Sequence, residues 1–197
     1  MSRVLALAAA TAAALFATTP AAQAACPVKP TKQAFAQWLD FAPYVLAEGG
    51  SFEGSTTSWS LAGARVGAGN EPYYLNERRD VKSLALGSGA TATSPPTCVT
   101  LEHPTVRFMV RRTGSPLGVL TVHALVRDGA GLLNVVPMGV VTGLGSAWQP
   151  SLPMILTTGL VGSLVDGSAT VRFRFTVTGL GGAFQVDDVF VDPYKRG

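Results

Sequence analysis

The stretch ATVRFRFTVT, residues 169–178, alternates apolar and polar side chains without a break. In an extended chain its apolar side chains share one face, and they are Val171, Phe173, Phe175 and Val177. The opposite face carries Arg172, Arg174, Thr176 and Thr178. A period of two is typical of a strand whose sheet is buried on one side only. This stretch therefore predicts a β-strand that packs its Val and Phe face onto a core.

Other segments repeat the pattern. TVRFMVRR, residues 105–112, places Val106 and Phe108 opposite Arg107 and Arg111. Further strands are expected over residues 57–66, 81–87, 98–101, 117–127, 132–141, 154–157 and 183–191. The connections are rich in Gly, Pro, Ser and Thr, and no alternation of strands with helices suggests a parallel sheet. Eight or nine strands predict an all-β fold, an antiparallel β-sandwich of the jelly-roll type.

Two segments stand apart from this strand pattern. TKQAFAQWLD, residues 31–40, has Thr31 as a candidate cap and places Phe35, Trp38 and Leu39 at helical spacing. It predicts one short N-terminal helix that packs against the sandwich, since so short a helix is unstable alone. GSGATATSPP, residues 87–96, has the composition of a linker and predicts an exposed loop.

The first 25 residues have the organisation of a secretory signal peptide: Arg3, an apolar run over residues 4–17, and small residues around Gln23. The apolar run is shorter than the roughly 20 residues that span a bilayer. No later segment is long and uncharged enough for a membrane span. We therefore expect an exported protein, secreted or located in the cell envelope, whose residues 26–197 form a single domain.

Cys26 and Cys98 are the only cysteines of the 197-residue chain. Because export leads to an oxidising compartment, we expect them to form a disulfide. In the chain-entropy model a bridge across so long a loop stabilises the fold by about 4 kcal/mol. Lipidation of Cys26 is the alternative, although a lipidated cysteine usually has Leu three positions before it, and this chain has Gln23 there.

Charge and histidine content exclude several function classes. Of the 15 Lys and Arg residues only Arg3 lies in the leader, so the rest carries a net charge of +2 without a basic block. This is no signature of nucleic-acid binding. The two histidines, His103 and His123, belong to no catalytic motif, and the chain lacks a G-x-S-x-G elbow, H-E-x-x-H and a Walker loop. We expect no enzyme, although a dispersed catalytic triad stays open.

The ends of the chain resemble a known group of domains. EGGSFE, residues 48–53, followed by Trp59, resembles the opening of secreted galactose-binding-like and carbohydrate-binding jelly-roll domains, and FQVDDVFV, residues 184–191, resembles their last strand. The resemblance covers about residues 45–192. It implies that the first and last strands are neighbours and share a structural calcium ion, with Glu53 and Asp188 as ligands and Asp187 as a less certain one.

The adjacent acids Asp187 and Asp188 allow two interpretations. In a regular strand Asp188 points the same way as Val186 and Phe190, and a buried carboxylate there needs a partner such as calcium. A β-bulge at the two acids would instead return Val189 to the core face and leave both carboxylates facing solvent or an Arg.

Carbohydrate-binding modules stack sugar rings on exposed aromatic side chains, and the candidates here are Tyr73, Tyr74 and Trp148. The two tyrosines lie in a predicted loop, NEPYYLNE, residues 70–77; the alternative is an ordinary loop with one tyrosine packed into the core. A basic patch for acidic sugars is a further candidate if the strands over residues 105–112 and 170–178 are neighbours. If they are not, the same arginines lie on solvated sheet faces: Arg107, Arg111, Arg172 and Arg174.

These patterns favour a secreted, non-catalytic domain that binds a polysaccharide or cell-wall glycan. A structural or interaction protein of the cell envelope without a small ligand is the alternative, and a hydrolase is the least favoured. Neither nucleic acid nor a membrane span is expected.

Overall fold

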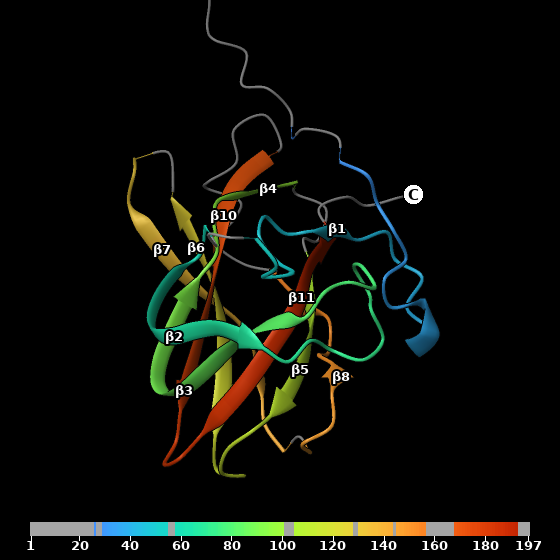
Figure 1. The fold of residues 1–197 in the computed structure, drawn as a ribbon. Coiled ribbons are helices and arrows are strands. Elements are labelled where there is room, and N and C mark those ends of the chain that lie inside the picture. Colours follow the sequence, from blue (N-terminus) through green and yellow to red (C-terminus); the bar gives the residue numbers. More distant parts are fainter. Residues whose placement is uncertain are drawn as a thin grey trace, which may run out of the picture.

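The structure is a computed structural model that describes residue 26 and residues 29–54, 58–100, 105–127, 130–143, 145–156 and 168–192 (Figure 1). The predicted signal peptide and His103 lie outside the described residues. Within this part of the chain the elements are η1 (Ala36–Trp38), β1 (Val45–Leu46), β2 (Ser60–Ala68), β3 (Lys82–Thr93), β4 (Thr97–Thr100), β5 (Thr105–Arg112), β6 (Val119–Arg127), β7 (Leu133–Val141), β8 (Gln149–Pro150), β9 (Met154–Ile155), β10 (Ser168–Thr178) and β11 (Ala183–Asp192).

The strands form one antiparallel sheet that folds over on itself. Its order is β7-β6-β10-β3-β11-β5-β8, with β2 on β3, β1 on β11, β4 on β10 and β9 on β5. Residues 84–87 of β3 pair with β11, whereas residues 91–93 pair with β10. The start of β3 therefore belongs to a β5 layer (β11, β5, β8, β9), and its end to a β10 layer (β10, β6, β7). The predicted all-β jelly-roll sandwich is confirmed.

The exposed loop predicted over residues 87–96 is wrong, because β3 continues to Thr93. The Gly- and Ala-rich stretch is the corner at which β3 crosses from one layer to the other. Gly87 and Gly89 are exposed, and a Cβ at either would meet no atom within 4 Å. Gly89 has φ +81°, which favours glycine. Small side chains allow a strand to bend here, so a linker-like composition marks a bent strand.

The core lies between the two layers. All four apolar side chains of the alternating stretch in β10 are 0% exposed, as predicted: Val171, Phe173, Phe175 and Val177. Across the sandwich, the ring of Phe175 meets that of Phe108 in β5 edge-on at 5.0 Å between centroids. Trp59 packs on Phe175 as well, with 5.6 Å between centroids, and is buried.

A second apolar cluster covers the outer face of the β5 layer. It joins side chains from distant segments: Phe35, Tyr44, Leu75, Met109, Trp148 and Phe190. Two connections supply the cover, residues 31–46 and residues 69–81, which we call the covering layer. Figure 1 shows both, in blue and green, on the side of the sheet where β5 and β8 lie. One outer face of the sandwich is thus partly enclosed.

The predicted N-terminal helix is wrong beyond a single 3-10 turn, η1. Thr31 caps nothing there: Phe35 precedes the turn without a side-chain cap, and Leu39, with φ 62°, ends it. Tertiary contacts replace helical ones, since Phe35 is fully buried and Lys32 bridges to Tyr44 through both backbone groups. A stretch this short gains more from these contacts than from a second helical turn.

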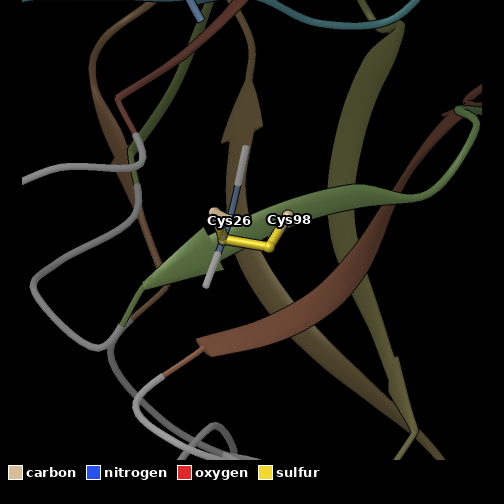
Figure 2. Close-up of a disulfide and its surroundings, with 2 residues drawn as sticks. All are labelled: Cys26 and Cys98. Carbon is tan, nitrogen blue, oxygen red and sulfur yellow. A yellow bond between two sulfur atoms is a disulfide. The ribbon is translucent and has the colours of Figure 1, made fainter. Parts of the chain in front are cut away.

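The predicted disulfide is confirmed. Cys26 is bonded to Cys98 on β4, with their Cα atoms 5.5 Å apart (Figure 2). Since the Cys26 sulfur is used in the bridge, it is not free to carry a thioether-linked lipid. The described residues contain no helix that is long and apolar enough to cross a membrane.

Candidate functional site

The last strand contains the bulge that was one of the two interpretations of its acidic pair. The pairing of β11 with β5 shifts register between Asp187 and Phe190, and Asp188 adopts φ +46°. Aspartate tolerates this left-handed conformation better than most residues. Val189 and Val191 consequently face the main core, while Phe190 joins the outer cluster.

The two carboxylates nevertheless face neither solvent nor an arginine, so that part of the interpretation is wrong. Asp187 is 0% exposed and Asp188 is 1% exposed. The Glu71 amide donates to Asp187 Oδ2 at 3.1 Å, and the Asn76 amide donates to Asp188 Oδ2 at 3.0 Å. The acidic pair therefore fixes the backbone of residues 69–81 onto the β5 layer.

Two further acids complete this anchor, and sequence reasoning missed both. Glu71 is 1% exposed and accepts hydrogen bonds from the amides of Tyr73 and Leu75. Asp80 is 6% exposed and accepts from the Glu77 amide and the Asn76 side chain. No local pattern predicts that these acids are buried, because they bond to amides of their own irregular segment, which has neither strand nor helix periodicity.

Burial changes the ionisation of the pair. Desolvation, followed by the charge of Asp188, raises the pKa of Asp187 to about 9. Desolvation, followed by the charge of Glu71, raises the pKa of Asp188 to about 8. Lys32, which donates to the carbonyls of Leu75 and Asn76, has its own pKa lowered, chiefly by desolvation. At neutral pH this anchor thus favours bound protons, or a cation in their place.

The opening motif meets the last strand, as the resemblance implies. β1 pairs with β11, and Val189 exchanges backbone hydrogen bonds with Ala47 and Gly50. A Cβ on Gly50 would lie 2.6 Å from the Val189 carbonyl oxygen, so only glycine fits this approach. Trp59 donates from its indole N–H to the Glu48 carbonyl at 3.1 Å. Gly50 and Trp59 of the opening motif therefore have packing roles.

Glu53 has a different contact from the expected one: its Oε1 accepts from the amides of Val81 and Lys82, at 2.7 and 2.5 Å. Among the residues that the structure describes, no three His, Cys, Asp or Glu side chains form a group that could hold a metal. One observation does suit a cation, since Asp188 Oδ1 is buried and has no hydrogen-bond partner. Calcium binding stays a prediction, and it rests on Asp188 more than on Glu53.

The three aromatic candidates lie in different environments. Tyr73 is 46% exposed and Tyr74 is 49% exposed, so neither is packed into the core; Leu75 is the residue of this segment that is buried. The Tyr73 ring meets that of half-buried Trp38 edge-on, 5.0 Å between centroids. Trp148 is only 7% exposed, and the Arg111 guanidinium lies 5.0 Å from its ring centroid. A sugar ring therefore has access to the tyrosines and little access to Trp148.

The predicted basic patch does not form, because β5 and β10 lie in different layers. Arg107 is 7% exposed: it pairs with Asp40, donates to the Ser151 carbonyl at 2.9 Å, and lies over the Phe35 ring. Arg172 is exposed on the opposite side of the sandwich. Arg107 and Arg172 therefore cannot bind one ligand together.

A pocket of about 400 Å³ lies beside the edge strand β2. Its lining is mostly apolar and small, with one ammonium group, and consists of Gly54, Leu61, Val66, Gly67, Ala68, Val81 and Lys82. Part of this wall is held in place by Glu53 through the amides of Val81 and Lys82.

No protein-family model matches the sequence, and no curated protein matches it significantly. Solved structures do share the fold. A xylan-binding domain, CBM22-1 of Paenibacillus barcinonensis Xyn10C, is 19% identical with a TM-score of 0.51, covering 75% of this chain and 93% of that domain. The tandem CBM22-1–CBM22-2 domains of the same protein give 16% identity and a TM-score of 0.53, over 78% of this chain and 46% of theirs.

A third similar structure is the CBM22-1 and GH10 modules of Clostridium thermocellum xylanase 10B, complexed with xylohexaose. It is 11% identical with a TM-score of 0.51, and the match covers 75% of this chain and 28% of that one. At these identities the likeness concerns the fold. The chain thus has the jelly-roll fold of carbohydrate-binding modules, as its end motifs predicted.

Proposed function

We propose that this protein is a secreted, non-catalytic domain that binds a polysaccharide or cell-wall glycan. The observation that carries the proposal is the pair of exposed tyrosines, Tyr73 and Tyr74, on a segment whose backbone is fixed by buried carboxylates. The fold supports it, since similar structures include a xylan-binding domain and a module solved with xylohexaose.

The anchor matters because binding costs less when the binding groups are already ordered. Five backbone amides of residues 71–77 donate hydrogen bonds to buried carboxylates, those of Glu71, Tyr73, Leu75, Asn76 and Glu77. Trp38 supports the Tyr73 ring from the side and leaves the tyrosine about half exposed. Such a ring offers an apolar face to a sugar and a hydroxyl to its polar groups.

A binding role without catalysis fits the chemistry of the described residues. His123 lies within β6, opposite Arg174 of β10 and Pro137 of β7. The strongly perturbed carboxyls, Asp187 and Asp188, are occupied in holding backbone amides and are nearly inaccessible. The raised pKa values of this pair, to about 9 and about 8, follow from burial and from neighbouring acidic groups, and the hydrogen bonds from the backbone amides lower them in part.

Affinity gel electrophoresis of the secreted chain against xylan, galactan, β-glucan and pectin tests the proposal. We expect retardation by at least one polymer, and a loss of about tenfold in affinity in Tyr73→Ala, since one stacked ring contributes about 1–1.5 kcal/mol. Tyr74→Ala should show a smaller loss.

Leu133→Ala is the matched control, because Leu133 is 49% exposed, like the tyrosines, but lies on β7 in the other layer. It should bind as the unchanged protein does. If no polymer retards the chain, or if Tyr73→Ala and Leu133→Ala behave alike, the proposal is wrong.

A second candidate function, an interaction protein of the cell envelope, is favoured by the edge strand β7. Several large apolar side chains in and beside it are about half or more exposed: Leu132, Leu133, Val135 and Val140. Exposed apolar edges are places where protein partners pair. Sedimentation velocity and a pull-down from envelope fractions, each comparing the unchanged chain with Val135→Lys, would reveal a partner that the variant loses.

A further inference from the structure

Four residues from four strands lie in one row on the outer face of the β5 layer. Pairing places Arg65 of β2 opposite Ala85 of β3, Ala85 opposite Gln185 of β11, and Gln185 opposite Arg111 of β5. Directly opposite residues of antiparallel strands project on the same face of the sheet. Their chain neighbours Leu84, Leu86, Val110, Phe184 and Val186 are buried in the main core, so the row points outward.

The row is the first on this face that the covering layer leaves open. One step towards the covering layer, the outward residues Ser83, Met109 and Asp187 are each 0% exposed. In the row itself Arg65 is exposed, and Ala85, Gln185 and Arg111 are partly exposed. Ala85 lies in the row between Arg65 and Gln185, and its small side chain projects little above the sheet. Three strand spacings separate the Cα atoms of Arg65 and Arg111, about 14 Å.

The Arg111 guanidinium is held in a fixed orientation. Its Nε donates to Gln185 Oε1 at 2.6 Å, and the guanidinium lies 5.0 Å from the Trp148 ring centroid. Gly69, the first residue of the 69–81 part of the covering layer, approaches the guanidinium from one side: a Cβ there would lie 3.5 Å from Arg111 Nη2. A guanidinium fixed through Nε keeps its two terminal nitrogens for a planar, two-oxygen acceptor.

The positive charge of the row has no partner on the protein within the described residues. The ion pairs in that part of the chain join Lys29 to Glu48, Arg79 to Glu77 and Arg107 to Asp40, and none includes Arg65 or Arg111. The nearest acid along β11 is Asp187, two positions from Gln185 and covered. Its Oδ2 accepts from the Glu71 amide, so this carboxylate is used in holding the covering layer.

From this juxtaposition we propose that the Arg65–Gln185–Arg111 row selects a polysaccharide that bears carboxylate groups, as uronic acids do. Arg111 binds one carboxylate through its terminal nitrogens, Gln185 orients Arg111, and Arg65 attracts a second carboxylate further along the polymer. The inference rests on the proposed polysaccharide binding and names the class of polysaccharide bound.

The test uses polygalacturonate and its fully methyl-esterified form, which has the same sugar chain with each carboxylate replaced by an uncharged methyl ester, with neutral xylan and dextran sulfate beside them. Binding of the secreted chain to each is measured by isothermal titration calorimetry at 0.05 and 0.5 M NaCl. We expect at least tenfold tighter binding of polygalacturonate than of its ester, and weakening of that binding at the higher salt concentration.

Variants of the row locate the effect. Arg111→Gln should lose the preference for the free acid, and Arg65→Gln should reduce it by about threefold. Arg111→Lys keeps the charge without the planar guanidinium, so its preference for the free acid should lie between those of Arg111→Gln and the unchanged chain. Arg172→Gln, an exposed arginine on the opposite face, is the control and should bind normally. Thermal melting of each variant separates loss of binding from loss of folding.

Each result is decisive. Equal binding of the acid and its ester, or binding of neutral polymers alone, overturns the inference and leaves the proposed function standing. Dextran sulfate bound as tightly as polygalacturonate shows unspecific anion attraction and also overturns it. Failure to bind any of the four polymers, with the chain folded, overturns the inference, and the proposed function is contradicted as well only if galactan and β-glucan are not bound either.

Discussion

The same three residue types, Val-Arg-Phe, occur in β5 and in β10 and have different fates. Val106 and Phe108 of β5, like Val171 and Phe173 of β10, are 0% exposed in the main core. The arginines between them both point away from that core, yet Arg107 is 7% exposed and paired, whereas Arg172 is exposed.

The difference lies in what covers each layer. Residues 31–46 and 69–81 lie over β5 and bring Asp40 and Phe35 to Arg107. Alternation therefore determines which side chains enter a two-layer core, and it says nothing of a third layer on the outside. Tyr73 and Tyr74, both exposed, lie on the covered face, so the covering layer also distinguishes the two faces in their chemistry.

The largest expected effect on stability comes from removing the disulfide, which connects the chain before the covering layer to the β10 layer. Cys26 precedes the covering segment, and Cys98 lies on β4 beside β10. Replacing both by Ser should lower the free energy of unfolding by about 4 kcal/mol, because the unfolded chain regains the freedom of a long loop. Urea denaturation measures this, and a loss below about 1 kcal/mol would contradict the entropic account.

Exchanging each arginine for alanine tests the comparison directly. Arg107→Ala should cost about 3 kcal/mol, since it removes the cation that pairs with Asp40 and the donor to the Ser151 carbonyl in a largely buried place. The Asp40 carboxylate would keep its hydrogen bonds from Tyr44 and Ala42 but lose its ion pair. Arg172→Ala should change stability by less than about 0.5 kcal/mol. Both are measured by urea denaturation, and similar losses in the two variants would show that the covering layer does not protect Arg107.

The buried acids predict that the free energy of unfolding falls as the pH rises, the opposite of what carboxyl groups with lowered pKa values produce. The pKa values of Asp187 and Asp188 lie above the ordinary value of 3.8, at about 9 and about 8, so the folded chain retains protons that the unfolded chain releases. Stability should be greatest below pH 4 for these groups and fall as the pH rises, by about 2 kcal/mol between pH 6 and pH 8 for one retained proton.

Asp187→Asn should flatten this dependence, because its amide oxygen can still accept from the Glu71 amide without a charge. Glu48→Gln, at an exposed carboxyl, is the control and should leave the slope unchanged. Stability that rises between pH 6 and pH 8 would contradict the assignment.

The smallest expected effect is that of calcium. If the ion binds Asp188, it replaces a proton and should stabilise the fold most at high pH, by about 1 kcal/mol at a few times its dissociation constant. Melting at pH 8 with calcium or with a chelator measures this, and Asp188→Asn should abolish the difference. Identical melting curves for the unchanged chain would count against calcium.

Local pattern predicted much of the framework. The strand around Phe175, the antiparallel sandwich and the bridge of Cys26 with Cys98 are confirmed, and so is the pairing of the first strand with the last, which the resemblance of the end motifs implied. The two wrong segments, the helix over residues 31–40 and the loop over residues 87–96, follow local propensity that tertiary contacts overrule. Of the candidate site, the tyrosines are exposed and their binding of a sugar stays a prediction, while the buried acids Glu71 and Asp80 were missed.

By itself the sequence determined which side chains of the alternating strands enter the core, because period-two alternation is a local property. That the first and last strands meet was implied by the resemblance of the two end motifs. Only the tertiary structure decided the use of the polar residues. Whether Arg107 is buried, whether Asp187 anchors a loop, and which side chains share a row with Arg111 depend on segments far apart in the chain. The charge state and the contacts of a polar group are set by such neighbours, and no local pattern encodes them.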